Sequence, residues 1–275
     1  MSTGQRLLFL FTGWLIVLMP FLFWWNTWFG RQLPDAQLAE YLHDDKKPRH
    51  IQHALVQLGE RMAKHDASAA RWYPDLTRLA NYGVEEVRNT DAWVMGQDVS
   101  SKPALDARFH ETLLKMLADP SPLVRGNAAL SLVRFGDPAG RPQIVALLSP
   151  ATITAQQAGK IVDTSTVGTP IHQDGVVAKL QTPTQTVELR SPIGGRLRSL
   201  AVHAGQNVAA GDEVAAVSPG SEQAWEALRA LYVIGQPDDL PAVLPYEREG
   251  PDISKEVSQQ AALTEKAIRQ RSTAQ

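Results

Sequence analysis

Residues 186–214 carry short alternating runs separated by glycine turns, and this pattern narrows the possible folds more than any other feature of the chain. Polar and apolar residues alternate in Thr186–Arg190, and a second run, Arg196–Val202, follows the turn Pro-Ile-Gly-Gly. Two more glycine turns begin at Ala204 and Ala210. Short strands with frequent tight turns predict a small β barrel or sandwich. On both sides of this segment the chain has the pattern of helices instead.

The helical part before the β segment is repetitive. Three runs share an arginine in the same place, and these arginines stand 39 and 37 residues apart: Arg49, Arg88 and Arg125. Each run ends at a glycine, namely Gly59, Gly96 and Gly136. This spacing suits repeats of two helices each. The best copy, Leu117–Pro138, resembles a HEAT repeat, and the alternative is an irregular helical domain with accidental spacing.

The same helical pattern returns after the β segment. Ala227–Pro237 resembles Ala128–Pro138 at a constant offset of 99 residues. Residues 141–148 and 222–234 then form the two helices of one split repeat, so that the β segment stands where a tight turn belongs. We expect a domain inserted into that turn, with its two ends close together. The predicted division is an anchor at 1–30, HEAT-like repeats at 35–149, the inserted β domain at 150–220 and resumed repeats at 221–271.

The N-terminal segment Leu7–Phe29 contains no charged residue. At a rise of about 1.5 Å per residue it would reach about 34 Å, enough for a hydrocarbon core of about 30 Å. Trp24, Trp25 and Trp28 gather near one end, as expected at a membrane interface. This pattern predicts an uncleaved single-pass anchor in the inner membrane, with the remaining chain outside the cytoplasm. A cleaved signal peptide is the alternative.

The β segment resembles the second half of a biotinyl or lipoyl domain, a barrel-sandwich hybrid. The shared string is Ser-Pro-x-Gly-Gly-x-Leu, followed by Leu-x-Val-x-x-Gly-Gln-x-Val-x-x-Gly-Asp-x-Val. The resemblance implies that a carrier lysine would stand about eight residues before Pro192, where this chain has Thr184 and Gln185. Lys179 is displaced by five or six positions. A lipoyl or biotin carrier using Lys179 is therefore an alternative, not the main interpretation.

Histidines suggest two further alternatives. Zinc endopeptidases of the lysostaphin type share the Val-x-x-Gly-Gln-x-Val stretch, but they bind metal through a His-x-His pair that this chain lacks, and His203 reads as a surface residue. His50 and His53 lie one helical turn apart, near His43, Asp44 and Asp45. They form either a metal site or the polar face of a solvated helix. We assign no metal, cofactor or catalytic residue.

Composition and the resemblances together lead to a function hypothesis. The chain has no cysteine, which excludes disulfides, thiolate metal sites and a cysteine nucleophile, and its net charge of −2 does not favour nucleic acid. Unmodified lipoyl-like domains with an N-terminal anchor also occur in membrane-fusion or periplasmic adaptors. We therefore predict a mainly α fold, a HEAT-like α-solenoid with an inserted small all-β domain and one transmembrane helix. The expected function is a non-enzymatic scaffold or adaptor for protein partners in a cell-envelope transport or secretion complex, without a small-molecule substrate.

Overall fold

The computed structural model describes residues 3–28, 32–97, 107–250 and 252–273, and in the first helix it describes side chains at residues 4–5 and 11–22. The chain divides into two compact units, residues 1–58 and 59–275. Each unit is described by itself.

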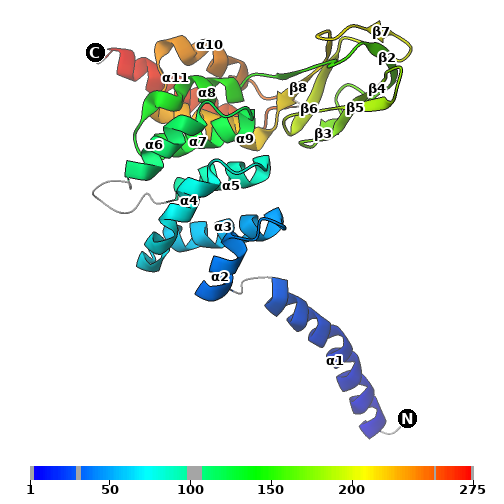
Figure 1. The fold of residues 1–275 in the computed structure, drawn as a ribbon, viewed down its shortest axis with the longest axis vertical. Coiled ribbons are helices and arrows are strands. Elements are labelled where there is room, and N and C mark those ends of the chain that lie inside the picture. The colour runs from blue at the N-terminus through cyan, green and yellow to red at the C-terminus, as the bar shows by residue number, and fades with distance from the viewer. Residues whose placement is uncertain (1–2, 29–31, 98–106, 251, 274–275) are drawn as a thin grey trace. The chain divides into compact units, whose positions relative to one another are not determined.

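The described residues form helices at both ends of the chain and strands between them (Figure 1). The α-helices are α1 (Thr3–Trp28), α2 (Asp35–Leu42), α3 (Pro48–Ala63), α4 (Tyr73–Leu79), α5 (Glu85–Met95), α6 (Ala107–Met116), α7 (Pro122–Arg134), α8 (Arg141–Leu147), α9 (Ser221–Ile234), α10 (Leu240–Val243) and α11 (Lys255–Thr273). The strands are β1 (Ala151–Thr154), β2 (Gly159–Thr164), β3 (Pro170–Ile171), β4 (Val176–Gln181), β5 (Thr186–Arg190), β6 (Gly195–Leu200), β7 (Asn207–Val208) and β8 (Glu213–Pro219).

The first unit contains α1, α2 and most of α3. Leu38 and Leu42, one turn apart on α2, are fully buried, as are Leu55 and Leu58 on α3. An apolar stripe at this spacing is what a short amphipathic helix needs in order to pack.

The predicted membrane anchor at residues 1–30 is contradicted. Crossing a hydrocarbon core takes about 20 consecutive apolar residues in one helix. Within the described ranges, no helix combines the required length with the required apolarity. This finding also contradicts the predicted single-pass membrane protein and its inner-membrane location. The side chains of Trp24, Trp25 and Trp28, expected at a membrane interface, lie outside the described residues.

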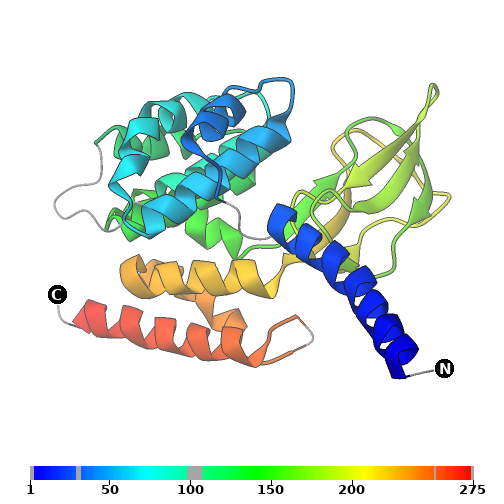
Figure 2. The same cartoon turned by 90° about the horizontal axis from the view of Figure 1, so that it is seen from below.

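The helices of the second unit pack in a regular order. Helix α6 packs on α7, and α8 packs on α9, while α5, α7, α9 and α11 contact one another in succession. Figures 1 and 2 show α9 and α11 side by side. Small residues permit the close approach of these helices, since Ala129 of α7 and Ala224 and Ala227 of α9 are buried in one apolar cluster with Ile144 and Leu231.

Local sequence sets the ends of α7. The hydroxyl oxygen of Ser121 accepts a hydrogen bond from the Val124 amide, and Pro122 occupies the first turn, both of which favour a helix start. The helix ends before Gly136, whose φ of +78° only glycine adopts easily. The amides of Gly136 and Asp137 then donate to the carbonyls of Val133 and Leu132, which closes the last turn.

A buried ion pair joins successive helix pairs. Arg88 of α5 donates from Nε to Oδ2 of Asp119 at 2.7 Å and from Nη2 to Oδ1 at 3.0 Å. Burial alone would raise the pKa of Asp119, but the hydrogen bonds from Arg88 and from the Ser121 amide outweigh it and hold that pKa below its usual value.

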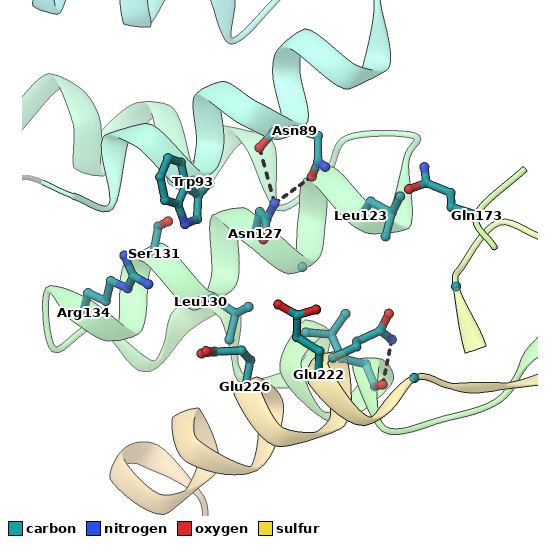
Figure 3. A pocket seen from close by; sticks show the side chains of 15 residues that line it. Asn89, Trp93, Leu123, Asn127, Leu130, Ser131, Arg134, Gln173, Glu222 and Glu226 are labelled. Atoms are coloured by element: carbon teal, nitrogen blue, oxygen red, sulfur yellow. Dashed lines mark hydrogen bonds between the residues drawn. The ribbon is translucent and has the colours of Figure 1, made fainter. Parts of the chain in front are cut away.

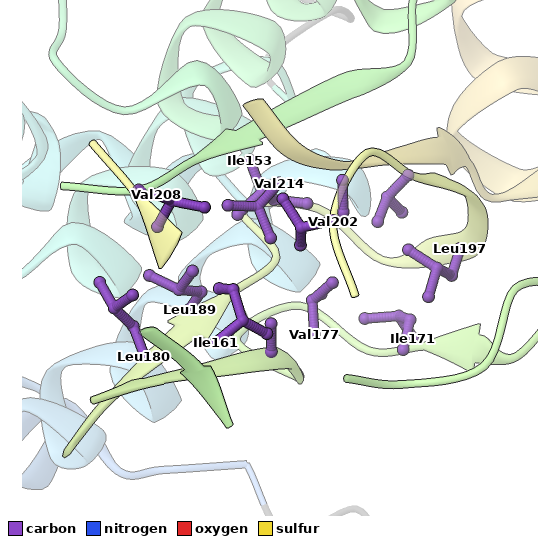
Figure 4. Close-up of a cluster of buried hydrophobic side chains, with 14 of the residues drawn as sticks. Ile153, Ile161, Ile171, Val177, Leu180, Leu189, Leu197, Val202, Val208 and Val214 are labelled. Carbon is purple, nitrogen blue, oxygen red and sulfur yellow. The ribbon is translucent and has the colours of Figure 1, made fainter. Parts of the chain in front are cut away.

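The eight strands form two antiparallel four-stranded sheets, ordered β1-β8-β6-β3 and β5-β4-β2-β7. The inner faces of the two sheets share one apolar core (Figure 4), with these members labelled: Ile153, Ile161, Ile171, Val177, Leu180, Leu189, Leu197, Val202, Val208 and Val214. Because β1 pairs with β8, Ala151 opposite Val217, the two ends of the segment lie together. We call residues 151–219 the β module.

Gly195 is required where β6 passes β8. A Cβ atom there would lie 1.8 Å from the carbonyl oxygen of Ser218, far inside van der Waals contact. The neighbouring Gly194 meets nothing closer than 3.7 Å. Only one glycine of the pair is therefore dictated by packing.

The predicted fold class is wrong as stated. The described residues form a mixed α and β fold, in which helices stand beside two antiparallel sheets. The physical reason is that the β module buries an apolar core of its own, separate from the core between the helices. The β module is therefore a folded part of the protein with its own core, not a small addition to a helical fold. The expected transmembrane helix is absent from the described residues.

Candidate functional site

The main cavity of the second unit, with a volume of about 580 Å³, opens along α5, α7 and α9 and reaches the edge of the β module (Figure 3). We call it the inner groove. Its lining residues are Asn89, Trp93, Leu123, Gly126, Asn127, Leu130, Ser131, Arg134, Leu147, Gln173, Gly194, Gly220, Glu222, Gln223 and Glu226.

Hydrogen bonds from α7 to α5 fix the floor of the groove. Asn127 donates from Nδ2 to Oδ1 of Asn89 at 2.8 Å and to the Asn89 carbonyl at 3.3 Å. One turn later, the hydroxyl of Ser131 donates to the carbonyl of Ala92 at 2.8 Å. Two positions one turn apart are thus held to the neighbouring helix, so the polar groups of the floor are ordered before any ligand arrives.

The floor also presents apolar surface. Trp93 of α5 is 37% exposed, which is a large fraction for an indole on a helix that packs on α4, α6 and α7. Leu130 of α7 is half-buried and also lines the groove, and Leu123 at the start of α7 is half-buried against the core of the β module. Aromatic and aliphatic side chains in a concave surface are what a binding surface uses for affinity.

Helix α9 forms an acidic wall. Glu222 and Glu226 stand one turn apart on α9, and both line the groove. Figure 3 shows Glu222 rising from α9 toward the floor below Asn127. The carboxylate of Glu226 lies 3.6 Å from Arg229 of the same helix.

Among the described residues, the one basic side chain that lines the groove, Arg134, lies at the end away from the β module. Arg134, at the C-terminal end of α7, donates to the carbonyl of Gly96 at 3.4 Å. Figure 3 places Arg134 at the opposite side of the view from Gln173 of the β module. Glu226 lines the part of the groove that also contains Arg134, so the acidic and basic side chains are not separated between its two ends.

The β module supplies the end of the groove. Gln173, in the loop between β3 and β4, and Gly194 before β6 line it. Gln223 of α9 donates from Nε2 to the carbonyl of Leu147 at 2.9 Å, which ties the end of α8 to the start of α9 across the base of the module.

A second cavity of about 470 Å³ shares Leu130, Arg134 and Glu226 with the inner groove and continues toward α11. Its lining adds Val233 and Leu263, which are 56% and 54% exposed. The groove and this cavity form one connected surface along the inner faces of α7, α9 and α11.

The lining of the groove suits binding better than covalent chemistry. Its fifteen described residues include no histidine, lysine, cysteine or tyrosine, and the two carboxylates that could act as bases stand on α9, whereas the one hydroxyl, that of Ser131, is on α7. Ser131 is buried, and its hydroxyl hydrogen is engaged by the Ala92 carbonyl. What the groove offers is amide groups, carboxylates, a guanidinium and apolar surface.

Lys179 lies outside the groove, within strand β4. It pairs across the sheet with Asp163 of β2 and Glu188 of β5, and its Nζ lies 3.9 Å from Oδ2 of Asp163. The exposed tip of the hairpin between β4 and β5 carries Thr184 and Gln185 instead. A carrier lysine needs a projecting tip from which its cofactor can swing, and a lysine inside a strand between two carboxylates does not provide one.

The histidines named from the sequence do not come together as a site. His50 contacts Oδ2 of Asp44 at 2.8 Å through Nδ1, and its ring stacks on Tyr41 with ring centres 4.2 Å apart. Nδ1 of His43 lies 3.0 Å from the carbonyl of Ala39. The exposed His203 lies in the turn after β6, with Nδ1 3.1 Å from the Ala204 carbonyl. In the part of the chain that the structure describes, no group of three or more metal-binding side chains occurs.

Sequence reasoning missed every residue of the groove. One usable signal was present in the repeat. Asn127 follows Asn89 by 38 residues, and Trp93 and Ser131 follow these two asparagines by four residues each. Following the repeat beyond its arginines would have found this floor. The acidic wall had a signal as well, because the offset of 99 residues between α7 and α9 places Glu226 at the position of Asn127.

The comparisons with known proteins do not assign a function to this chain. No family model and no curated protein matches the chain. Among solved structures, a single-chain, multi-domain long-chain acyl-CoA carboxylase is similar over 36% of this chain and 10% of its own, with 20% identity and a TM-score of 0.25. The chain thus spans about a tenth of that protein's length, and the likeness is too low to carry an argument.

Proposed function

We propose that this protein is a non-enzymatic scaffold that binds a protein partner along the inner groove. The observation that carries the proposal is an open groove whose polar floor is held by hydrogen bonds between α5 and α7 and whose lining has no nucleophile paired with a base. A preorganised, partly apolar surface of this kind lowers the entropic cost of binding another chain. The membrane-anchored part of the sequence hypothesis is not carried forward.

Site-specific photocrosslinking in cells of the source organism tests the proposal. A photoreactive residue replaces Trp93 in the groove, or Leu114 on α6 as the control. The two positions are matched, because Trp93 is 37% exposed and Leu114 is 36% exposed, and Leu114 does not line the groove. We expect one discrete crosslinked protein from position 93 and none from position 114.

A second variant separates groove binding from random proximity. Glu226→Lys reverses a charge of the wall, and it is expected to remove the crosslink from position 93 while the variant keeps its circular dichroism spectrum. Equal products from positions 93 and 114, or a crosslink that Glu226→Lys leaves unchanged, would count against a binding groove.

A further inference from the structure

The inner groove has features that specify the chemistry of its occupant, and the inference drawn from them rests on the proposed function. A partner segment in the groove meets amide groups from the floor, carboxylates from α9 and an apolar patch at Trp93 and Leu130. Each of these three features selects a different property of the segment.

The amide pair on the floor has unused hydrogen-bonding capacity of both kinds. Nδ2 of Asn127 donates to Asn89. Within the described residues, Oδ1 of Asn127 is therefore left as an acceptor and Nδ2 of Asn89 as a donor. A helix satisfies its backbone groups internally, whereas an extended chain has exposed N–H and C=O groups. A fixed donor and a fixed acceptor therefore fit the peptide backbone of an extended segment.

The acidic wall selects a positive side chain. Glu222 and Glu226 face the groove one turn apart, and among the residues lining the end beside the β module there is no cation. Arg134 lies at the opposite end, and Arg229 faces the second cavity, where it also covers the ring of Trp225 at 4.5 Å. A lysine or arginine between Glu222 and Glu226 would meet two carboxylates, of which that of Glu226 also lies 3.6 Å from Arg229, while an acidic residue there would be repelled.

We infer that the groove binds an extended segment of a partner protein, with a lysine or arginine between Glu222 and Glu226 and an apolar side chain over Trp93 and Leu130. The backbone of the segment lies along the amide pair of Asn89 and Asn127.

The test uses the full-length chain and a display library of random 12-residue peptides. Peptides selected by the wild-type chain are expected to share a lysine or arginine next to an apolar residue. Glu222→Gln and Glu226→Gln are each expected to weaken the best peptide about threefold, and together about tenfold, as for partly exposed ion pairs. Glu213→Gln, at an exposed position of β8 outside the groove, is the matched control and should leave affinity unchanged.

A backbone N-methyl scan of the best peptide tests the extended conformation. Methylation at one interior amide is expected to lower affinity at least tenfold, because the Oδ1 of Asn127 then loses its donor, and Asn127→Leu should remove the difference between methylated and unmethylated peptides. Uniform tolerance of N-methylation, or an induced helical spectrum, would overturn the extended form.

Other outcomes separate this inference from the proposed function. Peptides that need Trp93 but show no basic preference, or that ignore the two glutamine variants, would overturn the inference and leave the scaffold in place. Self-association of the chain that Trp93→Ser abolishes would overturn it in favour of a second copy in the groove. Selection of no peptide that depends on Trp93, combined with no crosslink from position 93, would overturn both.

Discussion

Asp91 of α5 is a buried carboxylic acid without a hydrogen-bond partner among the described residues. Its replacement tests how burial affects the stability of the fold. The residue is 0% exposed, and neither of its oxygens has a hydrogen-bond partner in the described structure. Burial raises the pKa of Asp91 well above 3.8, and the nearby positive charge of Arg78 offsets only part of that effect. The folded protein therefore keeps Asp91 neutral to a higher pH than the unfolded chain does.

The sign of the pH dependence follows from this raised pKa. Below about pH 4 the acid is protonated in both the folded and the unfolded chain, so it contributes no pH dependence. Above that pH the unfolded chain releases the proton and the folded chain keeps it. The free energy of unfolding then falls by about 1.4 kcal/mol for each pH unit until the folded pKa is reached.

Asp91→Asn keeps the volume of the side chain and removes the titration. The variant and the wild type are expected to be similarly stable near pH 4, and the variant should gain about 1.4 kcal/mol over the wild type for each further pH unit. Guanidinium chloride unfolding at pH 4.0, 5.0 and 6.0 measures the difference. Glu86→Gln, at an exposed position of the same helix, is the control and should show no such slope. A variant less stable than the wild type at pH 6 would refute the reasoning, because it would mean that Asp91 is ionised and paired.

Three further predictions test the fold and the carrier alternative. Arg88→Met should cost about 3 kcal/mol by chemical denaturation, since it strands a buried carboxylate, and the loss should shrink below pH 4, where Asp119 becomes protonated. Gly195→Ala should lower the free energy of unfolding by more than about 2 kcal/mol because of the 1.8 Å clash, whereas Gly194→Ala should be nearly neutral in thermal denaturation. The peptide that contains Lys179, taken from the protein of the source organism, should have its unmodified mass, and a lipoyl or biotin increment on it would contradict the interpretation of that strand residue.

Local patterns predicted individual elements well. The alternating run Thr186–Arg190 is strand β5, and the expected run Arg196–Val202 overlaps β6. Helix α3 continues through Gly59 to Ala63, so the stop predicted there is wrong, whereas α5 and α7 end at Met95 and Arg134, close to the glycines that the sequence marks as stops. These features depend on near neighbours in the chain, which is why residue pattern and turn chemistry were enough to place them.

The inner groove could not be predicted in the same way. It brings Asn127 of α7 and Glu222 of α9 into one lining although 95 positions separate them, since 222 minus 127 is 95. Their approach depends on the pairing of β1 with β8, which returns the chain to the end of α8. The offset of 99 residues aligns Glu226 with Asn127, but it does not show that the two helices line one groove, which depends on the folded chain.

The attachments of the β module determine what it can do for the groove. Arg196 of β6 forms an ion pair with Asp252 at 2.6 Å, and Gln223 and Tyr246 donate hydrogen bonds to the carbonyls of Leu147 and Leu148 at the end of α8. The ion pair reaches the module itself, whereas the two hydrogen bonds hold the start of α9 and the segment before α11 to the end of α8, where the module is attached. The module is joined to helices at both ends of its base, and an ion pair links β6 to the segment before α11. Gln173 and Gly194 of the module line the end of the groove, and under the proposed function they would bound the segment that binds there.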